Sequence, residues 1–300
     1  MAATPVCVAL FGPTAVGKTA VAIALAELLR ARGEDPVAVS ADALQVYEGL
    51  GTLTGAATAD EQARLEHRLL GFVPVTSSFS VGEYMPLAHA EVDAALEAGR
   101  RPIVVGGTGL YLRAALAELD LRPPPGPELR AAIQARMDAE GPDALRDEVL
   151  GRAPGAQIAR GDRNRIIRYL ELLEMGEDPL PGERLWTAQM RVPTVLVGLV
   201  MDREELNGRI DTRMEAIAPA AIDEVRAAEA AGASPTARKA HGFDDLLRGD
   251  LEAMKLKARQ FARRQMTWMR KLPGVQMVDT TGRPAGDVAA EILRLVPPRA

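Results

Sequence analysis

The sequence predicts an α/β protein in which a parallel sheet is flanked by helices. Short apolar runs of β-rich composition recur along its 300 residues, and helical patterns separate them, as in βαβ units. The runs occupy residues 5–11, 36–40, 101–107, 192–200 and 275–279. Parallel sheets bind ligands at the carboxyl ends of their strands. The residues that directly follow these runs are therefore the first candidates for a functional site.

A second observation divides the chain. Between "LRPPPGP" (121–127) and "LPGERL" (180–185) no strand pattern occurs, and helical patterns such as 128–141 and 162–176 fill the gap. We interpret residues 121–189 as an all-helical insertion bracketed by proline-rich hinges. Residues 1–120 and 190–300 then form the α/β core, and 47% hydrophobic residues are enough to bury one.

Composition excludes several classes of protein. The single cysteine, Cys7, lies in the first apolar run, which excludes an internal disulfide and suits a reducing cytoplasm. No apolar run approaches the roughly 18 residues of a membrane span, and no basic leader opens the chain, so we expect neither insertion nor secretion. The net charge of −5 argues weakly against a nucleic-acid partner, unless positive charge is concentrated locally.

A glycine-rich motif, "GPTAVGKT" (12–19), follows the first run and has the spacing G-x-x-x-x-G-K-[ST] of a phosphate loop. Its backbone N–H groups and the dipole of the next helix would hold phosphates, Lys18 would add a charge, and the Thr19 hydroxyl would ligate Mg²⁺. We therefore predict a phosphate-loop NTPase-like core with Mg²⁺ as cofactor. The predicted phosphate-binding residues are Gly12, Pro13, Thr14, Ala15, Val16, Gly17, Lys18 and Thr19.

The other strand ends offer fewer carboxylates than nucleotide hydrolysis requires. Asp42 follows the second run and could be a magnesium ligand, a general base or a helix cap; position alone does not decide. Asp202 follows the fourth run as a strand stop or helix cap. The third run ends in a second glycine turn, "GGTGLY" (106–111), which would bring Thr108 near the phosphate loop, although a tight connection without function fits equally.

Two acid-poor segments concentrate positive charge. Residues 255–272 contain seven Lys and Arg residues and no acidic residue, and residues 160–168 contain four Arg residues and only Asp162. Such runs are often solvated faces, but two of them on an acidic protein favour a polyanion, with RNA the better interpretation. In the first segment we expect Leu256, Phe261, Met266 and Met269 to form a buried stripe.

Together these motifs resemble those of the bacterial tRNA dimethylallyltransferase family, also called tRNA isopentenyltransferases. The resemblance runs from about Val6 to Asp279. The phosphate loop alone is shared by many families, whereas the other motifs are more specific. They are, in order, "GPTAVGKT" (12–19), "SADALQVYEGL" (40–50), "VGGTGLYLRAA" (105–115), "DRNRIIRYLE" (162–171), "LNGRIDTRM" (206–214) and "ARQFARRQMTWMR" (258–270).

The resemblance implies transfer of the dimethylallyl group from dimethylallyl diphosphate to the exocyclic amine of the adenosine 3′-adjacent to the anticodon, in tRNAs that read U-starting codons. Pyrophosphate would leave whole, which suits the missing hydrolysis carboxylate. The helical insertion would contact the anticodon stem-loop. The resemblance further implies no membrane partner, and we expect a monomer in the cytoplasm.

The resemblance also implies roles for individual residues. Asp42 would accept the proton of the amine, Thr108 and Arg213 would lie near the reacting centre, and Thr19 would ligate the metal. Trp268 and Phe261 are either stacking platforms or, more commonly on an apolar helix face, core residues. The implied tRNA contacts are Asp42, Ala43, Leu44, Gln45, Thr108, Arg130, Asn164, Arg165, Arg168, Arg263, Arg264, Gln265, Trp268 and Arg270.

The chain departs from the family pattern in two places. Residues 51–57, "GTLTGAA", lack the usual acidic residue and lysine, and His241-Gly242-Phe243 replaces Ile-Gly-Tyr. His241 could be a tRNA contact, but we expect a solvated loop residue, and we expect His67 to make a structural hydrogen bond. Two other functions remain open at this stage: a small-molecule kinase with Asp42 as base, and a non-catalytic RNA-binding protein with a relic loop.

Overall fold

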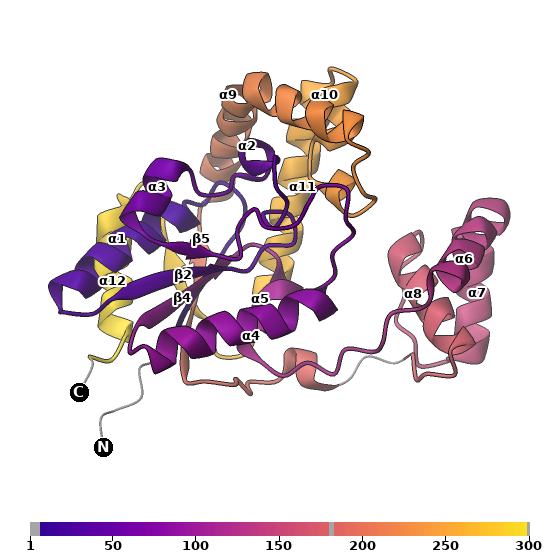
Figure 1. Cartoon of the computed structure of the whole chain (residues 1–300), viewed down its shortest axis with the longest axis horizontal. Coiled ribbons are helices and arrows are strands. Elements are labelled where there is room, and N and C mark those ends of the chain that lie inside the picture. Colours follow the sequence, from indigo (N-terminus) through magenta and orange to yellow (C-terminus); the bar gives the residue numbers. More distant parts are fainter. Residues whose placement is uncertain (1–6, 180–182, 299–300) are drawn as a thin grey trace. The chain divides into compact units, whose positions relative to one another are not determined.

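A parallel sheet forms the centre of the α/β core. The computed structural model describes residues 7–179 and 183–298. Within them the sheet has six strands in the order β3-β2-β4-β1-β5-β6, all parallel (Figure 1). The strands are β1 (Cys7–Phe11), β2 (Pro36–Ser40), β3 (His67–Arg68), β4 (Arg101–Gly106), β5 (Thr194–Val200) and β6 (Gln276–Asp279). The five runs identified in the sequence are all strands, whereas the two-residue β3 was missed.

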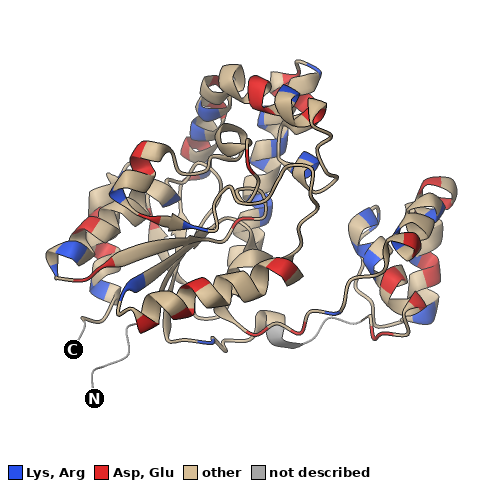
Figure 2. Ribbon diagram, in the orientation of Figure 1, with Lys and Arg blue, Asp and Glu red and all other residues tan. Residues whose placement is uncertain are grey.

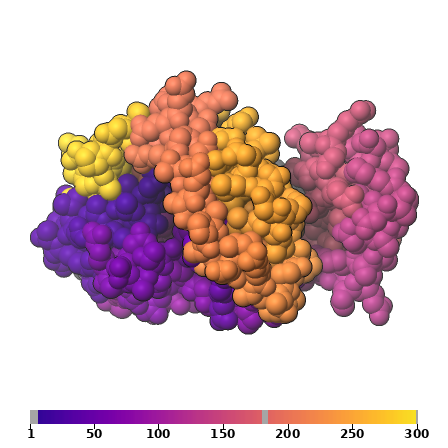
Figure 3. All heavy atoms as spheres, turned by 90° about the horizontal axis from the view of Figure 1, so that it is seen from above, coloured from indigo at the N-terminus to yellow at the C-terminus, as the bar shows by residue number. Residues whose placement is uncertain are grey.

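Helices flank this sheet. α1 packs against α12, and α4 packs against α5. α9 packs against α2, α10 and α11, and Figure 3 shows this orange segment beside the indigo and purple N-terminal half. These elements are α1 (Lys18–Ala31), α2 (Gly51–Thr54), α3 (Ala59–Arg64), α4 (Val81–Glu97), α5 (Gly109–Leu116), η1 (Glu183–Trp186), α9 (Arg203–Ala230), η2 (Ala237–Lys239), α10 (Phe243–Leu247), α11 (Leu251–Met269) and α12 (Ala285–Leu295). None of the described helices is long and apolar enough to cross a membrane.

Burial of the central strands explains why their sequences are continuous apolar runs. Every residue of β1, β2 and β4 is buried, as expected for parallel strands covered by helices on both faces. Asp202, two residues after β5, caps α9 by accepting hydrogen bonds from the N–H groups of Glu204 and Glu205. Of the two roles considered for Asp202, the helix cap is confirmed.

The strand register places the site. Phe11 at the end of β1 pairs with Gly106 at the end of β4, and Ser40 at the end of β2 pairs with Val105. The phosphate loop, Asp42 and the second glycine turn therefore emerge from adjacent strands at one edge of the sheet. β1 lies between β4 and β5. The connection that follows β1 runs toward one edge of the sheet and the connection that follows β4 runs toward the other, and ligands usually bind at such a point.

The chain forms two compact units. Met1–Glu118 with Trp186–Ala300 make the first, and Leu119–Leu185 make the second. The expected insertion, 121–189, overlaps the second unit, whose limits lie at 119 and 185. The second unit contains α6 (Pro127–Glu140), α7 (Pro142–Arg152) and α8 (Arg163–Glu174), packed around residues such as Ile133, Leu145 and Ile166. Residues 180–182 of the second proline-rich stretch lie outside the described residues.

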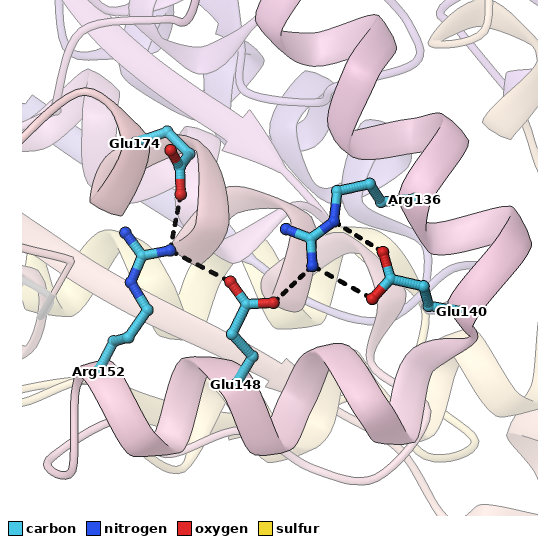
Figure 4. Close-up of polar contacts among 5 residues, drawn as sticks. All are labelled: Arg136, Glu140, Glu148, Arg152 and Glu174. Carbon is cyan, nitrogen blue, oxygen red and sulfur yellow. Dashed lines mark hydrogen bonds and ion pairs between the residues drawn. The ribbon is translucent and has the colours of Figure 1, made fainter.

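A chain of ion pairs links the three helices of this unit (Figure 4). Arg136 of α6 contacts Glu140 at 2.7 Å and Glu148 of α7 at 2.6 Å. Arg152 of α7 contacts Glu148 at 3.1 Å and Glu174 of α8 at 2.6 Å. These side chains are partly exposed, so each pair contributes at most about 1 kcal/mol. The apolar core is the main source of stability, and the ion pairs fix how the helices are aligned.

A buried ion pair in the first unit gives a testable prediction about stability. Arg101 Nε lies 2.6 Å from Glu34 Oε2, and the two side chains are 1% and 2% exposed. Arg101→Leu would leave the Glu34 carboxylate uncompensated, so we expect the free energy of unfolding to fall by about 3–5 kcal/mol. Urea unfolding followed by tryptophan fluorescence measures this, because Trp186 and Trp268 both lie in this unit.

Arg64→Leu is the matched control. Its pair with Glu27 is exposed on both sides, at 58% and 53%. We expect a loss below about 1 kcal/mol. Equal losses for the two variants would contradict the assignment of a stabilising role to the buried pair.

Candidate functional site

A cavity of about 260 Å³ opens at the carboxyl edge of the sheet. The phosphate loop forms one wall, and Asp42, Arg213 and residues of α11 form others. All of its lining residues belong to the first unit. They are Thr14, Ala15, Gly17, Lys18, Thr19, Ala20, Asp42, Leu44, Gln45, Leu53, Thr54, Gly55, Glu61, Arg213, Met214, His241, Ala258, Phe261 and Gln265.

The phosphate loop has the backbone conformation that an anion nest requires. Ala15 and Gly17 have φ values of 63° and 98°, in the left-handed region, and Gly17 caps the start of α1. Lys18 Nζ donates hydrogen bonds to the carbonyl oxygens of Gly12 (3.0 Å) and Pro13 (2.9 Å). Burial lowers the Lys18 pKa to about 8, with Arg213 adding to the shift and the Asp42 carboxylate opposing it. A bound polyanion would restore the full charge of this ammonium group.

Asp42 lies in a turn rather than at a helix start. Its Oδ1 accepts a hydrogen bond from the N–H of Leu44 (3.0 Å), and the next helix, α2, begins only at Gly51. The helix-cap interpretation of Asp42 is therefore wrong. Thr108 does not line the cavity, but its hydroxyl accepts a hydrogen bond from the N–H of Ala43 (3.3 Å) and so supports the same turn.

Arg213 brings a cation from α9 into the cavity. Its Nη1 donates to the hydroxyl of Thr14 at 3.4 Å. Burial lowers the Arg213 pKa, and the Asp42 carboxylate opposes that shift. Asp42, Lys18 and Arg213, which lie far apart in the sequence, thus line one cavity as a carboxylate beside two cations.

The atypical segment 51–57 is held by residues outside it. Gln45 Nε2 donates to the carbonyl oxygen of Gly55 (3.0 Å), and the Gln45 Oε1 accepts from the Ser40 hydroxyl (3.2 Å). The Glu224 carboxylate of α9 accepts from the N–H groups of Thr52 and Leu53. Gln45, an implied tRNA contact, therefore uses its amide within the protein. Glu224 was not identified from the sequence, because a single Glu on a long polar helix carries no signal.

The expectation for His241 is wrong. This residue lines the cavity and packs on Phe261 with ring centroids 4.0 Å apart, instead of lying in solvent. Burial lowers its pKa to about 4, and the nearby Arg264 adds to the shift, so the ring is neutral at pH 7. His67 makes the expected structural hydrogen bond, between Nδ1 and the Leu65 carbonyl oxygen at 2.6 Å.

The basic segment is neutralised over half of its length. Lys255 pairs with Glu215 and Glu252, Lys257 with the buried Asp245, and Arg259 with Asp211. Figure 2 shows acidic and basic residues intermixed over α9 to α11. Among the described residues, no ion pair within 4 Å is formed by the exposed residues Arg263, Arg264 and Arg270. The free positive charge thus lies in the C-terminal half of α11.

The buried face of α11 also differs from the expected stripe. Leu256 is 46% exposed, whereas Met269 is buried as expected. Gln265 is 4% exposed and hydrogen-bonded at both ends of its amide. Trp268 is half-buried and packs against Trp186, which is 39% exposed, with ring centroids 4.6 Å apart, so it is not a fully buried core residue. The buried positions of α11 are Met254, Lys255, Ala258, Ala262, Gln265 and Met269.

In the second unit a buried carboxylate organises two of the implied tRNA contacts. Glu171, 1% exposed, accepts from Arg130 Nε at 3.0 Å and from Arg168 Nη1 at 3.1 Å. Glu171 was missed because it reads as one polar residue in an amphipathic helix. Asn164 and Arg165 are exposed. Whether these residues contact tRNA stays a prediction.

A magnesium ion would find few protein ligands. Thr19 lines the cavity together with Asp42 and Glu61. Among the described residues no group of three or more His, Cys, Asp or Glu side chains could hold a metal. Mg²⁺ commonly takes one or two protein ligands and completes its shell with water and phosphate oxygens, so Thr19 and a carboxylate of this cavity could hold it, and Mg²⁺ as cofactor stays a prediction.

Comparisons with known proteins show the family of the chain. The model of the family described as IPP transferase matches residues 45–272. The chain is 38% identical to a tRNA dimethylallyltransferase of Kineococcus radiotolerans, over 97% of this chain and 96% of that one. The chain belongs to the tRNA dimethylallyltransferase family. A second relative of the transferase, from Rhodopseudomonas palustris, is 39% identical over 91% of this chain and 89% of that one.

Solved structures share the fold of this transferase. The tRNA isopentenylpyrophosphate transferase of Bacillus halodurans aligns with a TM-score of 0.70 at 28% identity, covering 97% of this chain and 95% of that one. A eukaryotic dimethylallyltransferase that acts on tRNA aligns with a TM-score of 0.73 at 19% identity, covering 98% and 80%. The predicted phosphate-loop NTPase-like fold is thereby confirmed.

The lowered pKa of Lys18 gives a prediction about anion binding. Below pH 8 the ammonium is charged before a ligand arrives; above pH 8 an anion must bind together with a proton. The dissociation constant of Mg²⁺-pyrophosphate should therefore rise by up to about tenfold per pH unit above 8. Titration calorimetry between pH 6.5 and 9.5 measures it.

Lys18→Arg is the control, because guanidinium stays protonated over this range. The ligand's own ionisation affects both proteins equally, so the ratio of their dissociation constants isolates Lys18. Parallel curves for the two proteins would contradict the lowered pKa.

Proposed function

We propose that this transferase moves the dimethylallyl group from dimethylallyl diphosphate to the exocyclic amine of the adenosine 3′-adjacent to the anticodon, in tRNAs that read U-starting codons. The observation that carries the proposal is the placement of Asp42, Lys18 and Arg213 around one cavity. A phosphate-binding loop faces a potential base there, and the family supplies the substrate class.

The reaction breaks the bond between the allylic carbon and the diphosphate oxygen. The electron pair leaves with pyrophosphate, and the allylic carbon carries partial positive charge in the transition state. Loop N–H groups, Lys18 and Arg213 would stabilise the growing negative charge of the leaving group. Thr19 would hold a Mg²⁺ ion, whose charge would further stabilise the leaving group.

The bond that forms joins the adenine nitrogen to the allylic carbon. This amine is a weak nucleophile because its lone pair is delocalised into the ring, and it must lose a proton as the bond forms. Asp42 would accept that proton, while its hydrogen bond from the Leu44 N–H fixes the carboxylate in place. The adenine must leave its stack to reach Asp42.

Recognition of tRNA would use both units. In the first unit, the exposed Arg263 and Arg264 of α11 and Arg270 directly after it would offer charge for phosphates. Arg130, Asn164, Arg165 and Arg168 offer polar groups in the second unit, which we propose contacts the anticodon stem-loop. We also propose that the chain acts as a monomer in the cytoplasm.

One assay tests the proposal. The protein is incubated with dimethylallyl diphosphate, Mg²⁺ and an unmodified tRNA that reads a U-starting codon, and the digested nucleosides are analysed by mass. One adenosine should gain a five-carbon group, and a tRNA with a different base at that position should not react. Absence of the modified nucleoside would overturn the proposal.

Asp42→Asn separates chemistry from binding. Asn keeps the side-chain oxygen that accepts from Leu44 N–H but does not take a proton at neutral pH. We expect the single-turnover rate of transfer to fall by at least about 10²-fold, with a much smaller change in donor affinity. If donor affinity falls equally and added Mg²⁺ restores both, Asp42 is a metal ligand; a near-normal rate means it has neither role.

Arg264→Ala and Lys257→Ala form a matched pair on α11. Arg264 is exposed without an ion pair among the described residues, whereas Lys257 Nζ lies 2.6 Å from Asp245 Oδ1. We expect Arg264→Ala to weaken tRNA binding and to reduce the slope of log affinity against log salt concentration by about one unit. Lys257→Ala should change the slope much less. Equal slopes for both variants and wild type would make α11 a solvated face.

A further inference from the structure

We propose that Gln265 is a positioning residue that joins the phosphate loop to the second glycine turn and thereby sets the affinity of the loop for the donor's diphosphate. The proposal deepens the proposed function and rests on it. It assigns to Gln265 a role inside the protein, in place of the tRNA contact implied by its motif.

The contacts of Gln265 use both ends of its amide. Oε1 accepts a hydrogen bond from the N–H of Thr14 at 2.8 Å, and Nε2 donates to the carbonyl oxygen of Gly107 at 2.8 Å. The side chain is 4% exposed. Loops from two adjacent strands, β1 and β4, are therefore connected through one side chain of α11. Loss of the amide would leave the buried Gly107 carbonyl and the partly buried Thr14 N–H without these partners, which costs more than the loss of a single exposed hydrogen bond.

The glycine turn has the shape that this connection needs. A Cβ at Gly107 would overlap Gln265 Nε2, and it would lie 3.5 Å from both Asp42 Oδ2 and the Gly12 carbonyl oxygen. A Cβ at Gly109 would overlap the ring of Trp268. Two glycines of "GGTGLY" thus make room for the Gln and the Trp of "RRQMTW". Motifs about 160 residues apart in the sequence form one packed contact.

The connection acts on Thr14, in the middle of the phosphate loop. Gln265 accepts from its N–H, and Arg213 donates to its hydroxyl, so both of these groups are held by other elements. A loop ordered before the ligand arrives binds more tightly, because the entropy of ordering is not lost on binding. The exposed Arg263 and Arg264 directly precede Gln265 on α11, so the helix that offers charge to RNA also supports the donor loop.

The test measures donor-side and RNA-side binding separately. Gln265→Met keeps the length of the side chain but removes both hydrogen bonds. We expect the dissociation constant of Mg²⁺-pyrophosphate to rise at least roughly tenfold, and that of an anticodon stem-loop RNA to change less than about twofold. Arg264→Ala should show the opposite pattern. Loss of RNA affinity with unchanged pyrophosphate affinity in Gln265→Met would overturn the proposal, as would no change in either.

Gln265→Glu gives a readout that general destabilisation would not produce. Its carboxylate can accept from the Thr14 N–H but faces the Gly107 carbonyl without a proton to donate. Pyrophosphate affinity, taken relative to wild type, should therefore recover as pH falls and the buried carboxyl is protonated. A pH-independent deficit relative to wild type would overturn the proposal. Failure of prenyl transfer in a wild-type protein that binds pyrophosphate would instead overturn only the proposed function.

Discussion

The parallel pairing of β1, β2 and β4 is the constraint on which the rest of the structure depends. Because Phe11 pairs with Gly106 and Ser40 with Val105, three loops leave the sheet at the same level. The phosphate loop, the turn of Asp42 and the second glycine turn are then close enough for single side chains to connect them, Thr108 in one case and Gln265 in another. A shift of this register by one residue would reverse the faces of a fully buried strand and separate the three loops.

The remaining side chains of the site come from helices that follow the insertion. α9 supplies Arg213 and Glu224, and α11 supplies Gln265, Phe261 and the exposed arginines. Acidic residues of α9 and α10 neutralise part of the positive charge of α11, since they pair with Lys255, Lys257 and Arg259. Positive charge therefore remains at the C-terminal part of α11, although the sequence distributes it evenly along the helix.

The sequence could predict what depends on local pattern. Five strands, the phosphate loop and the helical character of residues 121–185 follow from periodicity and glycine spacing. It could not predict β3, because two residues carry no periodicity, nor the exposure of Leu256, because the apolar stripe of α11 is set by what packs against it. The pairs of Lys255 with Glu215, Lys257 with Asp245 and Arg259 with Asp211 join residues from different helices, which no local pattern records. The same is true of the position of His241 and the contacts of Gln265.

Glu171 reduces the net positive charge of two arginines in the second unit. Arg130 and Arg168 carry two positive charges, but both contact one carboxylate that is 1% exposed, so the three groups together carry a single surplus charge. The trio would offset the charge of about one phosphate group rather than two. What the shared carboxylate adds is order: each guanidinium is already held in one orientation, and its planar face and remaining N–H donors are presented to a partner without first losing rotational freedom.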